Sequence, residues 1–365
     1  MARSPWASPR AWWGSASRVS RIAVVTSSPP FVEGGHLVIG RALVTALREH
    51  GHQADLITTP SNRFGRQASA YLANWMTDVG RTGGGERVDQ VISLRYPSYA
   101  VRHERHACWL NHPMREYYDL WDSFSARLSP QGRLKERVRR TLIRAADTYL
   151  FKHNVTKLFA QSQTVAARLR KWNGVGSEVL YPPAPPRHYR CESYGDFVFV
   201  YSRLAPLKRI GLVIDALSTP AAAGVRCVIA GDGEEREALA ARIRERGLSD
   251  RVTMVGHVSD EQLTAYLATC RAVCFVPKDE DYGMVTVEAF ASSKAVITAS
   301  DSGAPVELVE PGAVGAVVAP DAVALGLAMA AYAADAALAE RHGQVAGQRA
   351  ASMTWSHALD RLILR

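Results

Sequence analysis

Two cations lie close together in the segment SRLAPLK (202–208), directly after an apolar run, Phe197–Tyr201, that predicts a buried β-strand. Arg203 and Lys208 can both reach a ligand at the carboxyl end of that strand. Two fixed cations suit a diphosphate, because they stabilise the negative charge that grows on a diphosphate leaving group in the transition state. The spacing alone is a weak signal, since the solvated start of a helix often carries the same residue types.

Two glutamates lie eight positions apart in the segment EDYGMVTVEAFA (280–291). Glu280 falls in a loop that contains glycine, and Glu288 falls about one turn into the helix predicted to follow, so both can face a cleft. A carboxylate accepts two hydroxyl hydrogen bonds at once, so one can hold sugar hydroxyls and the other a ribose. Free backbone N–H groups would face the same ligand, those of Gly283, Met284 and Val285. Taken singly, either glutamate is more often a solvated charge.

A tight turn, Gly231-Asp232-Gly233, follows a second predicted strand, Val225–Ala230, and leads into a helix. Its backbone can lie against a base or a ribose. By itself the pattern indicates only a turn.

The triplet Asp279-Glu280-Asp281 has the form of a metal-binding Asp-x-Asp. Such a site would imply a Mg²⁺- or Mn²⁺-dependent transferase of a different fold. We expect neither a metal nor a resident cofactor, because cations of the protein already occupy the metal's role.

Predicted strands alternate with predicted helices along the whole chain, which indicates an α/β architecture with parallel sheets. In the first half the strands are expected at Ile22–Thr26, Ala54–Thr58, Gln90–Leu94, Trp109–Leu110, Thr156–Ala160 and Glu178–Tyr181. Pro182–Pro186 cannot continue a sheet and predicts a stiff linker. From Asp196 the alternation restarts, with strands at Phe197–Tyr201, Val225–Ala230, Val252–Val255, Ala272–Val276, Ala295–Thr298 and Gly315–Val318. Two doubly wound, Rossmann-like domains that face across a cleft form a natural nucleotide site.

The composition agrees with two globular domains: the 365 residues are 47% apolar and 22% charged, which excludes a disordered chain. Residues 1–190 hold 28 Lys and Arg against 13 Asp and Glu, whereas residues 191–365 hold 16 against 22. The basic half suggests an anionic partner such as phosphates or acidic lipid, with solvated surface charge as the alternative. Nucleic acid is not expected, because no recognition motif accompanies the charge. The longest weakly polar run, Ala322–Ala334, is 13 residues and too short to span a bilayer.

The segment Gly132–Phe151 combines basic and apolar residues at helical spacing. The basic ones are Arg133, Lys135, Arg137, Arg139, Arg140 and Arg144, and the apolar ones are Leu134, Val138, Leu142 and Ala145. Such a helix can lie on anionic lipid. We favour an ordinary helix that packs this apolar stripe inward.

Four motifs together resemble those of retaining glycosyltransferases of family 4, which have the two-domain GT-B fold: SRLAPLK (202–208), AGDGEE (230–235), EDYGMVTVEAFA (280–291) and SGAPVELV (302–309). The likeness covers about residues 21–360 and is most specific in the second half. It implies that Arg203 and Lys208 bind the donor diphosphate. It further implies that Glu280 contacts the transferred sugar and that Glu288 contacts the nucleotide ribose.

The first half is similar to the family more loosely. Gly34 and Gly35 look like the family's glycine loop beside the donor phosphates, and His112 looks like its histidine that contacts the sugar. A neutral imidazole there can donate to a sugar hydroxyl. Just beyond it, three residues can shape the acceptor side, with aromatic packing as the alternative: Arg115, Tyr117 and Tyr118.

Two departures from the family's pattern bear on the substrate. The family's usual Gly-x-Pro-Val is replaced here by Ser293-Lys294-Ala295-Val296. The middle glycine of its Gly-Gly-Pro is replaced by Ala304, whose methyl group restricts the backbone near the sugar. This restriction speaks against the fit of an ordinary hexose. Asp281, which precedes Tyr282 and stands where many members have glycine, resembles the members that use GDP-mannose. The donor loop therefore favours a GDP-linked over a UDP-linked sugar.

The first 20 residues lack the continuous apolar stretch of a secretory signal, so we expect a disordered tail or an over-long start there. Beyond them we expect an acceptor-side domain at 21–182, a linker at 183–196 and the domain that binds the nucleotide-sugar at 197–345. The resemblance further implies that 346–365 form a helix that crosses back. Domain closure would expel water that otherwise hydrolyses the donor, and no residue is assigned as general base. The alternative from another class is a catalytically idle GT-B scaffold that binds nucleotide or a partner protein.

The acceptor is expected to be a small molecule or a lipid-linked molecule. Five scattered cysteines without a CxxC pair argue against disulfides and a zinc site and favour the cytosol. Residues 132–151 could add peripheral contact with the inner face of a membrane.

Overall fold

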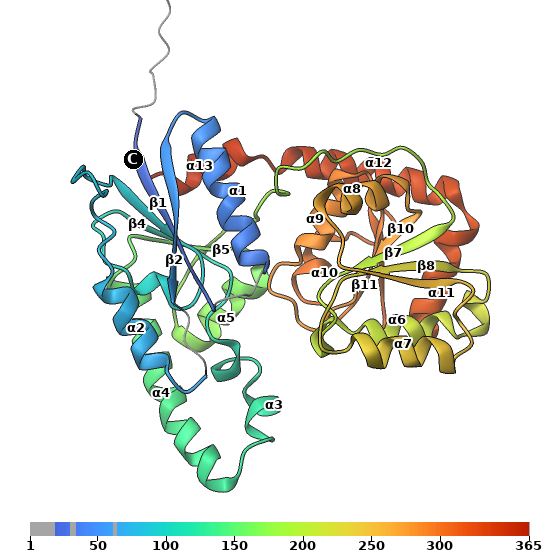
Figure 1. Ribbon diagram of the computed structural model, residues 1–365, viewed down its shortest axis with the longest axis horizontal. Helices are drawn as coiled ribbons and strands as arrows, with labels where there is room; N and C mark the ends of the chain where they lie inside the picture. Colours follow the sequence, from blue (N-terminus) through green and yellow to red (C-terminus); the bar gives the residue numbers. More distant parts are fainter. Residues whose placement is uncertain (1–18, 30–33, 61–63, 365) are drawn as a thin grey trace, which may run out of the picture.

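The computed structural model describes residues 19–29, 34–60 and 64–364. Within them the chain forms two separate six-stranded sheets, and every pair of neighbouring strands is parallel. Figure 1 shows two α/β bodies side by side, each a sheet between helices. The predicted fold class is confirmed. The disordered tail predicted for residues 1–20 falls almost wholly on residues 1–18, outside the described ranges.

The first sheet has the strand order β2-β1-β3-β4-β5-β6. Its strands are β1 (Arg21–Ser28), β2 (Gln53–Pro60), β3 (Gln90–Ser93), β4 (His106–Leu110), β5 (Lys157–Ala160) and β6 (Glu178–Val179). Its helices are α1 (Gly35–Glu49), α2 (Gln67–Met76), α3 (Trp121–Ser125), α4 (Pro130–His153) and α5 (Gln163–Asn173), with short 3-10 turns η1 (Ser98–Ala100) and η2 (Arg115–Tyr117).

The second sheet has the order β12-β11-β10-β7-β8-β9. Its strands are β7 (Phe197–Tyr201), β8 (Arg226–Ala230), β9 (Val252–Gly256), β10 (Ala272–Cys274), β11 (Val296–Ala299) and β12 (Gly315–Val318). The helices are α6 (Ile210–Leu217), α7 (Arg236–Glu245), α8 (Asp260–Thr269), α9 (Met284–Ala291), α10 (Ala304–Leu308), α11 (Ala322–Ala334), α12 (Ala336–Ser352) and α13 (Trp355–Leu362), with 3-10 turns η3 (Pro206–Lys208) and η4 (Pro220–Ala222).

Four inner strands are buried at every position because helices cover both faces of each sheet: β3, β4, β10 and β11. Burying one Val, Ile or Leu side chain contributes about 1.5–3 kcal/mol, so these short apolar runs hold the sheets together. Helix α8 begins with a capping box, in which Ser259 and Gln262 satisfy each other's backbone N–H groups.

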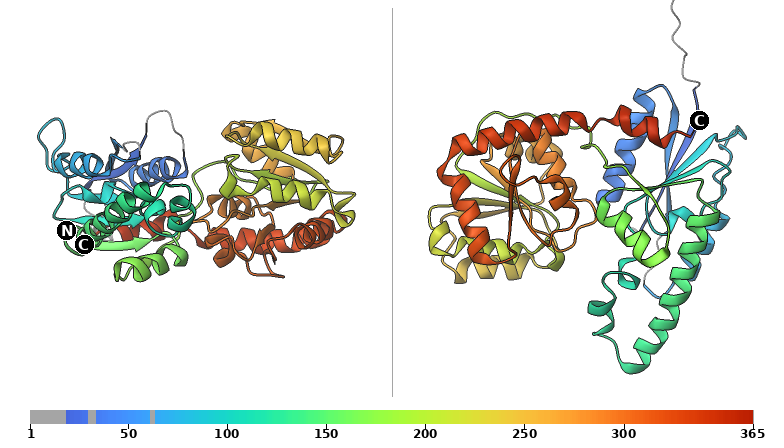
Figure 2. Two further views of the ribbon diagram at one scale, coloured as in Figure 1. Left: turned by 90° about the horizontal axis from the view of Figure 1, so that it is seen from below. Right: turned by 180° about the vertical axis from the view of Figure 1, so that it is seen from behind.

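The last helix, α13, lies against the first sheet. Gln90 Nε2 donates to the Leu362 carbonyl at 2.7 Å, and its Oε1 accepts from the Leu364 N–H at 2.8 Å. Trp355 meets the Trp109 ring edge to face, 6.2 Å between centroids. Figure 2 shows α12 running along the second body and α13 reaching the first, so the chain joins the bodies both there and at residues 183–196.

The apolar stripe of helix α4 does not face inward as predicted. Leu134, Val138, Leu142 and Ala145 are exposed, so the predicted inward packing of this stripe is wrong. The opposite face of α4 packs inward through Ile143, Leu150 and Phe151 and two acidic residues, Glu136 and Asp147. Sequence spacing identified a stripe but not which of two apolar faces the domain covers.

No helix within the described ranges is by itself long and apolar enough to cross a bilayer. Helix α11 and the segment 336–362 satisfy that test only when joined, with a bend of 98° between them.

Candidate active site between the two bodies

Two helix N-termini meet where the bodies face each other. A Cβ atom built on Gly35, the first residue of α1, would lie 4.0 Å from the Met284 Cε at the start of α9. Neither helix has a side-chain cap. Free N–H groups and the helix dipoles make such ends favourable for anions.

Lys208 and Glu280 come together beside this point. Lys208 Nζ lies 2.6 Å from Glu280 Oε2, and both side chains are one-fifth exposed. Arg203 is exposed, and its guanidinium makes no hydrogen bond or ion pair to any residue that the structure describes. The cationic pair predicted to bind a diphosphate is thus one free arginine and one lysine held by a carboxylate.

The backbone of Glu280 is fixed by the segment 302–304. Its N–H donates to the Ser302 carbonyl at 2.8 Å, and its carbonyl accepts from the Ala304 N–H at 3.0 Å. Gly303 has φ +76°, and a Cβ there would lie 2.5 Å from the Glu280 carbonyl oxygen, so this approach requires glycine. Ala304 is fully buried as the first residue of α10. Its methyl group therefore packs in the interior.

The turn 231–233 packs against the cation-bearing segment. A Cβ on Gly231 would lie 1.8 Å from the Ser202 carbonyl oxygen, and one on Gly233 would lie 2.3 Å from that of Leu204. The Leu204 N–H donates to the Asp232 carbonyl at 2.8 Å. These glycines therefore position the loop that carries Arg203, a role that the sequence did not indicate.

Glu288 is buried and already has three partners. It is ion-paired with Arg187, and it accepts hydrogen bonds from the Tyr189 and Tyr201 hydroxyls, each at 3.1 Å. Burial raises the pKa of Glu288, and the positive charge of Arg187 opposes that rise. Arg187 and Tyr189 belong to the segment between the two sheets, and no sequence motif predicted a role for either.

Asp281 lies in a cross-body cluster of charges. It is ion-paired with Arg168 of α5 and lies 3.5 Å from Arg115, while Arg168 and Arg115 both donate to the Asp279 carbonyl at 2.9 Å. Burial alone would raise the pKa of Asp281, but Arg115, His112 and Arg168 hold it below the usual value. Two carboxylates of the Asp-x-Asp triplet thus face arginines of the first body.

Glu307 of α10 forms a second contact between the bodies. Its carboxylate accepts from the N–H groups of Gln163 and Thr164, at 2.8 and 2.6 Å, and from the Tyr181 hydroxyl at 2.8 Å. Gln163 and Thr164 open α5, so a negative charge from the second body sits at the positive end of this helix.

His112 is largely desolvated beside the charge cluster. Burial lowers its pKa to about 4, and its Nδ1 lies 2.7 Å from the Pro113 carbonyl. The neutral ring therefore carries its proton on Nδ1, which leaves Nε2 as an acceptor. The expected donation to a sugar hydroxyl is reversed: the hydroxyl would donate to Nε2.

His36 and Arg95 were not singled out from the sequence. Arg95 Nη1 donates to His36 Nδ1 at 3.0 Å, and burial lowers the pKa of His36 to about 3. His36 Nε2 and Arg95 Nε are buried without a hydrogen-bond partner among the described residues. His36 Nε2 and Arg95 Nε are both N–H donors. They lie next to the glycine pair, because His36 directly follows Gly35 and Arg95 donates to His36.

Tyr117 and Tyr118 are buried on the inner face of α4, so the packing alternative describes them and the acceptor-contact expectation is wrong. Their hydroxyls donate to Glu136 at 2.7 Å and to Asp147 at 2.6 Å. Tyr282 is likewise buried, with its hydroxyl on the Pro182 carbonyl. Met284 and Val285 remain partly exposed at the start of α9.

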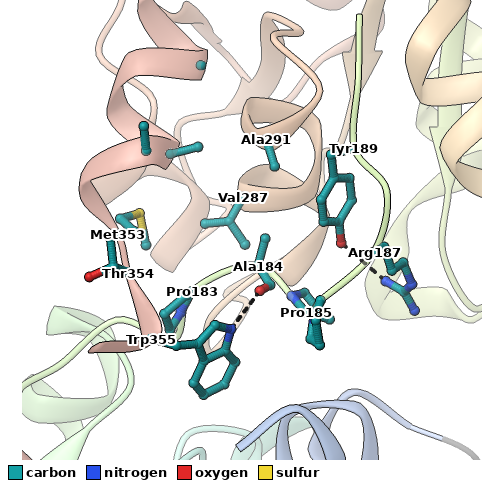
Figure 3. Close-up of a pocket in the computed structure, with 14 residues that line it drawn as sticks. Pro183, Ala184, Pro185, Arg187, Tyr189, Val287, Ala291, Met353, Thr354 and Trp355 are labelled. Atoms are coloured by element: carbon teal, nitrogen blue, oxygen red, sulfur yellow. Dashed lines mark hydrogen bonds between the residues drawn. The ribbon is translucent and has the colours of Figure 1, made fainter. Parts of the chain in front are cut away.

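A pocket of about 400 Å³ lies beside the two connections between the bodies, and neither Lys208 nor Glu280 lines it. The segment 183–187, α9 and the junction of α12 with α13 line it, and Trp355 Nε1 closes one side by donating to the Ala184 carbonyl at 3.0 Å. Figure 3 shows the side chains of Arg187 and Tyr189 at its edge.

The second body matches a known protein family. Residues 192–349 match the family described as glycosyl transferases group 1. The chain is 42% identical over 112 residues to a lipopolysaccharide core biosynthesis mannosyltransferase, LpcC, of Rhizobium leguminosarum bv. viciae, covering 29% of this chain and 30% of that protein. It is 32% identical over 130 residues to an alpha-D-kanosaminyltransferase of Streptomyces kanamyceticus, covering 34% and 33%. These alignments span about a third of the length of each relative.

Solved structures extend the likeness to both bodies. Sucrose-phosphate synthase from Thermosynechococcus elongatus superposes with a TM-score of 0.71 at 18% identity, covering 94% of this chain and 97% of that one. HepE from Anabaena, in complex with UDP and glucose, superposes with a TM-score of 0.65 at 18% identity, covering 93% and 99%. At this identity the likeness concerns the fold.

Proposed function

Because residues 192–349 match the family described as glycosyl transferases group 1, we propose that this protein is a retaining, metal-independent glycosyltransferase. It moves a sugar from a nucleotide-sugar donor to a small-molecule or lipid-linked acceptor. The observation that carries the proposal is the Lys208–Glu280 ion pair of 2.6 Å beside the exposed Arg203. Cations for a diphosphate and a carboxylate for a sugar lie at one place, where two uncapped helix ends meet.

The cations have the main catalytic role in this proposal. Arg203 and Lys208 bind the donor diphosphate, and Lys208 exchanges Glu280 for a phosphate oxygen when the donor enters. Fixed positive charge lowers the barrier because negative charge on the diphosphate increases as the sugar leaves. Glu280 is then free to accept hydrogen bonds from the sugar hydroxyls.

The first body completes the site. His112 Nε2 accepts from a sugar hydroxyl, while the N-terminus of α1 with Gly34 and Gly35 faces the phosphates. His36 Nε2 and Arg95 Nε supply further donors to the anionic part of the donor, which agrees with their burial without a partner.

A GDP-linked sugar is our preferred donor. The resemblance at Asp281 and the similarity to a mannosyltransferase support it, whereas the complex of HepE with UDP supports the UDP-linked alternative. Thermal-shift titration with GDP, UDP, ADP and dTDP distinguishes them, because the preferred nucleotide raises the apparent melting temperature most.

Metal independence rests on the same charges, since arginines already face Asp279 and Asp281. The test is release of nucleoside diphosphate from GDP- and UDP-sugars with and without EDTA. Turnover that survives EDTA supports the proposal, and turnover abolished by EDTA overturns the metal-independent mechanism. Absence of release from every donor favours the idle scaffold. The free cysteines favour the cytosol as the place of action.

A further inference from the structure

Helix α4 presents an apolar stripe that nothing in the described structure covers. Leu134, Val138, Leu142 and Tyr149 are 64%, 56%, 66% and 58% exposed. They are spaced four, four and seven residues apart, so they lie on one face, and at 1.5 Å per residue the stripe is about 22 Å long. The opposite face of the same helix packs against the core of the first body.

Positive charge borders the stripe. Arg133, Lys135, Arg137 and Lys152 are exposed on α4. The two acidic residues of the helix are buried and engaged, Glu136 by Tyr117 and Arg139 and Asp147 by tyrosines. The exposed surface of α4 is therefore apolar and basic, without a carboxylate.

The helix also stands out from the body. Figures 1 and 2 show the N-terminal half of α4 and the neighbouring α3 projecting beyond the first sheet. We propose that this face of α4 docks on the surface of an anionic phospholipid bilayer, with the stripe at the boundary between headgroups and acyl chains.

Charge distinguishes an anionic bilayer from the other candidates that could cover this face of α4. A second copy would bring the same basic face, and like charges would repel. Residues 1–18 carry Arg3, Arg10 and Arg18 and no acidic residue, so the chain's own N-terminal segment is not complementary either. An anionic lipid surface satisfies the cations and the apolar side chains together.

The test is co-sedimentation with vesicles of phosphatidylcholine and phosphatidylglycerol in equal parts. We expect binding that weakens at least tenfold on pure phosphatidylcholine and again at 0.5 M salt, because the attraction is largely electrostatic. L134S/L142S should weaken binding at least tenfold. R133Q/K135Q/R137Q should weaken it about 100-fold, since each basic residue near the surface contributes about fivefold.

The matched control is V323S/L327S on α11, which removes two apolar residues that are 61% and 56% exposed on the other body. It should bind like the wild type. Unchanged binding by both α4 variants, or no binding to anionic vesicles, overturns the proposal. A dimer in sedimentation analysis that L134S/L142S dissociates also overturns it, by assigning the face to a second copy. Vesicle binding needs no donor turnover, so its failure would leave the proposed reaction untouched.

Discussion

The ammonium of Lys208 and the carboxylate of Glu280 form an ion pair of 2.6 Å although 72 residues separate them in the chain. Lys208 ends η3, after β7, and Glu280 follows β10, the neighbouring strand. Parallel neighbours end at one edge of a sheet, so this topology brings the two motifs together. In the proposed function, this pair is exchanged for a phosphate at Lys208 and a sugar hydroxyl at Glu280 when the donor binds.

Lys208→Ala should lower kcat/KM for nucleotide-sugar turnover about 100- to 1,000-fold, because a fixed charge on the leaving group is lost. Nucleoside diphosphate release measures it. Lys278→Ala, an exposed lysine of the loop after β10, is the matched control and should change kcat/KM less than twofold. A Lys208→Ala protein with more than a tenth of wild-type kcat/KM would contradict the diphosphate role.

The proposed ribose contact of Glu288 requires that Arg187 release part of the carboxylate. Hydrogen bonds to a charged group contribute about 1.5–3 kcal/mol, so the wild type should bind the ribonucleotide about 10- to 100-fold more tightly than its 2′-deoxy analogue. Glu288→Gln should lose most of that preference, measured by calorimetry. Tyr189→Phe removes one partner of Glu288 without changing charge and should keep it. Equal preference in Glu288→Gln and wild type would exclude the ribose contact.

Local patterns predicted the sheets because strands covered on both faces are continuous apolar runs, as at Phe197–Tyr201. Helix α2 gave no such pattern: it buries Gln67 and Asn74 and exposes Leu72 and Met76. The helical period also could not tell which apolar face of α4 packs inward.

The candidate site likewise has residues that the sequence predicts and residues that it does not. A motif can be recognised in the sequence when its residues adjoin one another, as at 202–208 and 280–291. The partners of Asp281 and Glu288 are not, because Arg168 and Arg187 lie 113 and 101 residues away with no local motif. Charge pairing across that distance is set by the packing of the two bodies.

Arg168→Ala should shift the two bodies apart. It leaves Asp281 buried beside Arg115 alone, and breaking a buried ion pair costs about 3–5 kcal/mol in the form that contains it. Small-angle scattering should report a larger radius of gyration, and KM for the donor should rise more than kcat falls. Arg170→Ala, exposed on the same helix, is the control. If Arg168→Ala/Asp281→Ala is no more compact than Arg168→Ala, the loss of the Arg168 partner of Asp281 is not the cause.

Asp147 gives the fold a pH dependence that its variant should lack. It is buried on the inward face of α4 and accepts from the hydroxyls of Tyr99 and Tyr118 at 2.5 and 2.6 Å, and from Tyr71. Burial raises its pKa to about 6, which those hydrogen bonds only partly oppose. Because the folded state holds this proton more tightly than the unfolded state, Asp147 favours folding below about pH 4. That contribution is lost as pH rises through about 6, a change of about 3 kcal/mol.

The free energy of unfolding of the wild type minus that of Asp147→Asn should therefore fall by about this amount between pH 4 and pH 7.5, measured by urea denaturation. The subtraction removes the histidines, whose effects are common to both proteins, so a difference that stays constant or rises with pH would rule out the raised pKa.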